Sequence, residues 1–67
     1  MNLHINGENV EVPVTLVFVQ DLLLHFGLEE KVVIVELNGN ILEKADHQTT
    51  RLSDGDRIEI VHFVGGG

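Results

Sequence analysis

Apolar and polar residues alternate near the start of the chain, which predicts two β-strands there. Residues 3–6 and 10–12 carry apolar side chains at every second position, the period at which side chains of a strand face one side of a sheet. Residues 7–9 between them form a turn, so we expect an N-terminal hairpin. Pro13 has no N–H to donate to a ladder, so it should end the second strand or place it at a sheet edge.

The next segment has the apolar period of an amphipathic helix. Four apolar residues recur at the spacings of three and four that line one side of a helix: Val19, Leu22, Leu23 and Phe26. Gly27 follows this stripe and supplies the left-handed residue that commonly ends a helix. Phe18 stands where a capping Ser or Thr is expected, and Thr15 is the nearest residue able to cap.

The second half of the chain predicts a second hairpin and a final strand. The β-branched run 32–37 leads into Asn-Gly at 38–39, the strongest two-residue hairpin signal, with apolar residues 41–42 beyond it. The polar segment 43–50 is expected to be irregular, and residues 57–64 form the last strand. The order of hairpin, helix, hairpin and strand predicts an α+β fold with one helix on one face of a small sheet.

The length and charge of the chain limit the classes of function that it can have. The chain has 67 residues and no cysteine, which predicts a single domain over 1–67 without disulfides or thiolate chemistry. Four basic against eleven acidic residues give a net charge of −7, which disfavours nucleic acid and favours positively charged protein partners. No stretch has the length of a membrane span or the pattern of a signal peptide, so we expect a cytoplasmic protein.

The sequence shows no set of side chains typical of a catalytic or metal site. The four histidines lack the spacing of metal ligands, so we expect surface or packing histidines and no metal site. No nucleophile, acid–base pair or cofactor fingerprint stands out, and a domain this small has little room for a large cleft. The chain is therefore not expected to be an enzyme, nor to bind a cofactor itself.

Three glycines close the chain and form its most unusual feature. Residues 1–64 are expected to form the folded body, and Gly65, Gly66 and Gly67 a flexible tail. A tail without Cβ atoms is narrow and reaches about 10 Å beyond a strand. It can be threaded into the active site of a partner, which would join the carboxylate of Gly67 to AMP and then replace AMP by sulfur. A frayed, passive end is the alternative.

Apolar side chains are expected on the surface beside this tail. Ile58 and Ile60 should face the core, and the same alternation sends Val61 and Phe63 outward. Ile34, flanked by inward-facing valines, should lie on the same outer face. We expect Val61, Phe63 and Ile34 to dock a partner. A bulge near the end of the strand would instead turn Phe63 into the core.

Several segments together carry a family resemblance. Residues 52–60 (Leu-Ser-Asp-Gly-Asp-Arg-Ile-Glu-Ile) precede a short apolar stretch and the terminal glycines, and residues 62–67 read His-Phe-Val-Gly-Gly-Gly. Asn-Gly at 38–39 and Val-Gln-Asp-Leu-Leu at 19–23 fit the same pattern. The whole chain resembles the ThiS family of sulfur-carrier proteins in thiamin thiazole biosynthesis.

The resemblance implies a fold and a set of partners. The fold would be a ubiquitin-like β-grasp with the first and last strands parallel at the centre of the sheet. An E1-like adenylating enzyme would use ATP and Mg²⁺ to activate Gly67, and a sulfur-donor protein would supply sulfur for a thiocarboxylate. Thiazole synthase would receive that sulfur, and both enzymes would accept the tail through Gly66 and Gly67.

Other functions fit the same tail. The small subunit of molybdopterin synthase shares the fold and the diglycine, although those chains are usually longer. A ubiquitin-like modifier would join its terminal carboxylate to lysines of other proteins. A passive protein-interaction domain would not need Gly66 and Gly67 at all.

Overall fold

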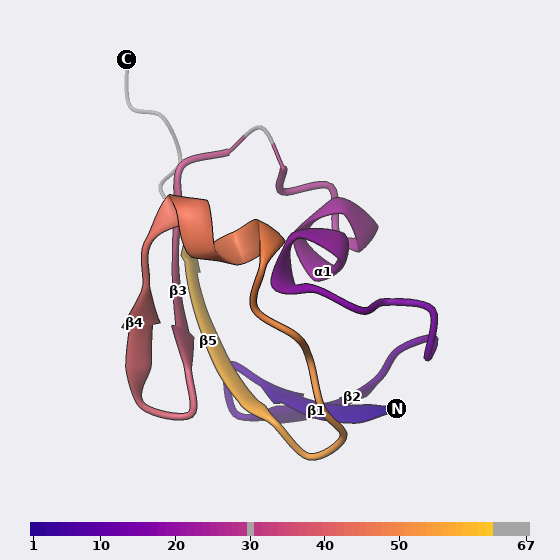
Figure 1. The fold of residues 1–67 in the computed structure, drawn as a ribbon. Helices are drawn as coiled ribbons and strands as arrows, with labels where there is room; N and C mark the ends of the chain where they lie inside the picture. The colour runs from indigo at the N-terminus through magenta and orange to yellow at the C-terminus, as the bar shows by residue number, and fades with distance from the viewer. Residues whose placement is uncertain (30, 63–67) are drawn as a thin grey trace.

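The computed structural model describes residues 1–29 and 31–62. The elements follow the order β1 (Asn2–Ile5), β2 (Glu8–Glu11), α1 (Val19–His25), β3 (Val33–Leu37), β4 (Asn40–Leu42), the 3₁₀ helix η1 (Lys44–Gln48) and β5 (Arg57–His62). The strands form one mixed sheet in the order β2-β1-β5-β3-β4, and α1 and η1 lie on the same side of it (Figure 1). β1 and β5 are parallel neighbours, and β5 is the central strand. The predicted α+β, β-grasp arrangement is confirmed.

Two Asn-Gly turns close the two hairpins. Asn38 and Gly39 have φ values of 48° and 88°, so the predicted second turn is confirmed. The turn predicted at residues 7–9 is wrong, because Asn6 and Gly7, with φ of 51° and 83°, form it and residues 8–9 already belong to β2. Asparagine and glycine both tolerate positive φ, which a two-residue turn needs to match the twist of its strands.

The core lies between α1 and the sheet. Its buried apolar residues are Leu3, Val12, Val19, Leu22, Leu23, Val35 and Ile58. Phe26, predicted to extend the helical stripe, is instead 44% exposed. The helix ends at His25, and the chain departs from helical geometry at Phe26, so that ring packs edge-on against the His25 ring at 5.1 Å. Gly27 has φ of 71°, as predicted for the residue after the helix.

An aspartate in the first turn of α1, and not Thr15, accepts hydrogen bonds from the backbone just before the helix. Phe18 occupies the N-cap position. The carboxylate of Asp21 accepts hydrogen bonds from the N–H groups of Phe18 at 2.9 Å and Val17 at 3.1 Å. The Asp21 carboxylate thus holds the chain at the start of the helix, while the first helical N–H, that of Val19, donates to the carbonyl of Thr50 at 3.0 Å.

The polar segment predicted to be irregular contains η1. The carboxylate of Asp46 accepts a hydrogen bond from the Glu43 N–H at 3.1 Å, and η1 brings the buried His47 against α1. A polar segment can become helical here because one buried residue anchors it to the neighbouring helix. Across the described residues, neither helix is long and apolar enough to cross a membrane.

Candidate functional site

The central strand β5 carries the chain toward its predicted reactive tail. It pairs with β3 over five positions, from Leu37 opposite Ile58 to Val33 opposite His62, and the pairing is regular up to His62. On its other side, β5 pairs with β1 only at its beginning. The predicted tail residues Gly65, Gly66 and Gly67, together with Phe63, lie outside the described residues.

The Asn6 side chain continues the contact between β1 and β5 beyond the last paired residues. Its Oδ1 accepts the N–H of Ile60 at 2.7 Å, and its Nδ2 donates to the carbonyl of Ile60 at 3.2 Å. The backbone N–H of Asn6 donates to the carbonyl of Ile58 at 2.9 Å. One asparagine thus satisfies both backbone groups of Ile60, two residues before the strand ends. In the sequence, Asn6 is recognisable only as part of an Asn-Gly pair. The hydrogen bonds of its side chain to Ile60 were therefore not predicted.

Replacing Asn6 by Gly is expected to loosen the end of β5 while leaving the turn geometry intact, since glycine also adopts positive φ. Losing the two side-chain bonds should speed exchange of the Ile60 amide hydrogen roughly 2- to 10-fold. Hydrogen exchange followed by NMR measures this change at each residue.

Asn38→Gly is the matched control at the other Asn-Gly turn. Asn38 Oδ1 accepts the N–H of Arg57 at 2.9 Å, at the beginning of β5. This variant should expose the Arg57 amide and leave Ile60 protected. Equal loss of protection at Ile60 in both variants would contradict a local role for Asn6.

The outer face of the sheet, opposite α1, carries an apolar patch beside the end of β5. Ile34 and Val61 lie directly opposite each other in register and are 43% and 51% exposed. Ile41 of β4 is diagonal to Ile34 and 71% exposed. We call these three residues the outer patch. The predicted outward orientation of Ile34 and Val61 agrees with the structure, and their docking role stays a prediction.

Two carboxylates flank the outer patch. Glu36 and Glu59 are directly opposite each other on β3 and β5, next to the pair formed by Ile34 and Val61. Like charges that face each other across strands destabilise a sheet. This acidic pair makes the outer patch complementary to an apolar surface with a basic rim.

Comparison with known proteins assigns the family. The ThiS family model matches residues 2–67. The chain belongs to the ThiS family. The sulfur carrier protein ThiS of Bacillus subtilis is 48% identical to it over 65 residues, which cover 97% of this chain and 98% of that protein.

A solved structure has the same fold as this chain, and part of a larger enzyme is similar to it in sequence. The crystal structure of the thiamine biosynthesis protein ThiS from Geobacter metallireducens matches with a TM-score of 0.82 and 38% identity, covering 100% of both chains. The thiazole synthase of Magnetococcus marinus is 38% identical over 69 residues, which cover all of this chain and 20% of that enzyme. The β-grasp fold that the resemblance implied is therefore shown.

The structure also places the four histidines of this ThiS-family chain. His4, His25 and His62 are exposed, whereas His47 is buried. Within residues 1–29 and 31–62, no group of three or more His, Cys, Asp or Glu side chains could hold a metal ion. The sequence did not distinguish His47 from the other three histidines. Its burial depends on the helix η1, which the polar sequence of that segment does not predict.

Proposed function

We propose that this protein is a sulfur carrier that delivers sulfur for thiazole formation in thiamin biosynthesis, as a thiocarboxylate on Gly67. The observation that supports the proposal most strongly is the near full-length match to the sulfur carrier protein ThiS of Bacillus subtilis. The match to part of a thiazole synthase favours the thiazole branch over the molybdopterin alternative. In this proposal the chain is a co-substrate of its partner enzymes and has no catalytic side chain.

The proposed reaction takes place on the terminal carboxylate. A carboxylate oxygen attacks the α-phosphorus of ATP, pyrophosphate leaves, and an acyl adenylate forms. The terminal sulfur of a persulfide on a donor protein then attacks the carbonyl carbon, AMP leaves, and an acyl disulfide forms. A thiol next attacks the donor's sulfur in that disulfide, which breaks the S–S bond, releases the thiocarboxylate and leaves the donor as a disulfide. An E1-like enzyme supplies the ATP and Mg²⁺ site, and the carrier contributes a positioned end of chain.

The outer patch is the proposed docking surface for the E1-like enzyme and thiazole synthase. Its apolar side chains adjoin the end of β5, so a partner seated there lies near the point where the chain continues toward Gly67. Glu36 and Glu59 add negative charge, which steers a partner with a basic rim onto this face. Phe63, at the next outward position by sequence, is proposed to extend the same surface.

Val61→Ala is expected to weaken partner binding with little effect on the fold. Truncating an exposed contact residue in an interface typically reduces affinity several-fold, and more where the residue is central. Titration calorimetry with the E1-like enzyme measures the loss. Val14→Ala is the control, since Val14 is 78% exposed and lies in the loop between β2 and α1, away from the outer patch. Equal affinity for both variants would argue against docking through β5.

Mass spectrometry tests the proposed chemistry directly. The chain is incubated with the host's E1-like enzyme, Mg-ATP and a sulfur source, and then measured intact and as C-terminal fragments. The expected product has one oxygen replaced by sulfur in the fragment that contains Gly67. Fragmentation is needed because oxidation of Met1 gives nearly the same mass shift. No change in that fragment, with an enzyme active on its own carrier, would reject the proposal.

A further inference from the structure

A groove of about 320 Å³ lies on the helix side of the sheet, beside the end of β5. The hairpin of β1 and β2 lines one part of it, and the segment that follows α1 lines another. Its floor consists of apolar side chains that are partly buried and pack against the core: Ile5, Val10, Leu28 and Ile60. Phe26 also lines the groove and is 44% exposed. The groove is therefore an apolar surface that stays open to solvent.

The groove and the outer patch flank the end of β5 on opposite faces. Side chains alternate along the strand, so Ile60 and His62 line the groove, whereas Val61 between them belongs to the outer patch. β1 pairs with β5 only at its beginning. Beyond that pairing, the Asn6 side chain accepts the N–H of Ile60 at 2.7 Å and also lines the groove. A partner that reaches the end of β5 can therefore contact both surfaces.

The length of chain beyond β5 brings such a partner close. Five residues follow His62 and end at Gly67. Even a fully extended chain of five residues spans at most about 18 Å. An enzyme that draws Gly67 into its active site must come within this distance of β5. Its surface then lies near both faces at the end of the strand.

The charge of the groove indicates which side chains of a partner fit it. Of the described residues that line the groove, Glu8 carries a carboxylate, and none is a lysine or arginine. The chain as a whole has a net charge of −7. An apolar side chain with a basic neighbour complements this combination of an apolar floor and an acidic rim.

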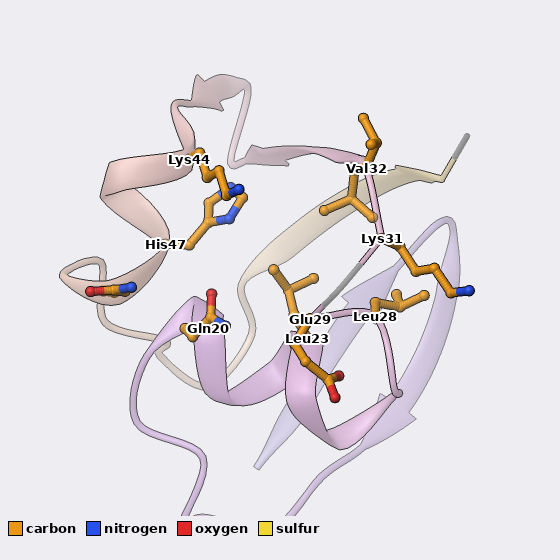
Figure 2. Close-up of a pocket in the computed structure, with 10 residues that line it drawn as sticks. Gln20, Leu23, Leu28, Glu29, Lys31, Val32, Lys44 and His47 are labelled. Carbon is orange, nitrogen blue, oxygen red and sulfur yellow. The ribbon is translucent and has the colours of Figure 1, made fainter. Parts of the chain in front are cut away.

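A second hollow, between α1 and η1, lacks this selectivity (Figure 2). Leu28 lines both the hollow and the groove. The lining of the hollow mixes charges of both signs, from Lys31, Lys44 and Glu29. The hollow therefore favours neither an acidic nor a basic partner, whereas the groove favours a basic one.

We propose that the groove is a second docking site for the E1-like enzyme that adenylates Gly67. It takes up an apolar side chain of that enzyme, which contacts Phe26 and Ile60, while a neighbouring lysine or arginine pairs with Glu8. Contacts on both faces stop the carrier from turning about the axis of β5, and this positions the terminal carboxylate toward the α-phosphorus of ATP. The inference rests on the proposed function and assigns a further surface to the same enzyme.

Titration calorimetry of the full chain with the E1-like enzyme tests the apolar contact. Phe26→Ala is expected to raise the Kd roughly fivefold to thirtyfold, as truncation of an aromatic anchor in an interface does. Leu24→Ala is the matched control, because Leu24 is 51% exposed on α1 and does not line the groove. This control should change the Kd by no more than about twofold.

A pair of charge reversals on β2 tests the acidic rim independently. Glu8 and Glu11 are both exposed, but only Glu8 lines the groove, so both variants should keep the fold. Glu8→Lys is expected to raise the Kd for the E1-like enzyme about tenfold, because it places a cation against the basic side chain of the partner. Glu11→Lys makes the same change of net charge and should have a much smaller effect. This pair still decides the question should Phe26→Ala fail to fold.

Exchange of pyrophosphate into ATP, measured with the wild-type chain, distinguishes failure of the groove proposal from failure of the proposed function. No exchange, with an enzyme active on its own carrier, would reject both. With exchange present, equal Kd values within each matched pair would overturn the groove proposal alone. An unchanged Kd for the E1-like enzyme with weaker binding of thiazole synthase would also overturn it, and would assign the groove to thiazole synthase.

Discussion

A chain that lacks Gly66 and Gly67 is expected to unfold at the same temperature as the full chain and to accept no sulfur. The buried core and the five strands that the structure describes lie within residues 1–62, so the truncation removes no residue of either. It does remove the carboxylate on which the proposed adenylation takes place. Thermal unfolding by circular dichroism and the mass-spectrometric sulfur assay measure the two effects on the same sample.

One residue added beyond Gly67 provides the sharper version of this test. The extended chain keeps every residue of the original, but the carboxylate is displaced and an amide takes its place at Gly67. We expect loss of adenylation to the background of the assay, with unchanged unfolding. Activation at the normal rate, with proteolytic trimming excluded by mass, would reject the carrier mechanism and favour a passive interaction domain.

Replacing Ile58 by Ala is expected to produce the largest loss of stability. Ile58 is fully buried in the central strand, where it pairs with Ile5 on one side and Leu37 on the other. Removing its buried methyl and methylene groups leaves a cavity and should lower the free energy of unfolding by about 2–5 kcal/mol. A domain of this size has roughly 3–5 kcal/mol to lose, so much of the variant should be unfolded at 37 °C.

Val61→Ala is the matched control on the same strand. Its side chain is 51% exposed on the outer face, so the free energy of unfolding should fall by no more than about 1 kcal/mol. Urea unfolding monitored by circular dichroism compares the two variants. A similar loss of unfolding free energy in both variants would contradict the structure, in which Ile58 is buried and Val61 is exposed.

The sequence alone predicted those elements whose cause is local. The Asn-Gly turn at Asn38 and the helix end at Gly27 need positive φ, and such residues reveal the need directly. Alternation along the last strand correctly separated the buried Ile58 from the exposed Val61, because a regular strand has a fixed period of two. Phe26 shows the limit of such periods, since the helix ended one residue before the stripe did.

The tertiary structure decided what depends on residues far apart in the chain. Asn6 holds Ile60 across 54 positions, and Glu36 meets Glu59 only because β3 and β5 pair. His47 lies in a polar segment without an apolar period, and only the packing of η1 against α1 buries it. The sequence determined the second turn, the helix, the strand faces and, through its resemblance, the family, whereas the tail chemistry stays a proposal. Long-range strand pairing decided which side chains adjoin the end of β5, because such contacts leave no periodic trace in the sequence.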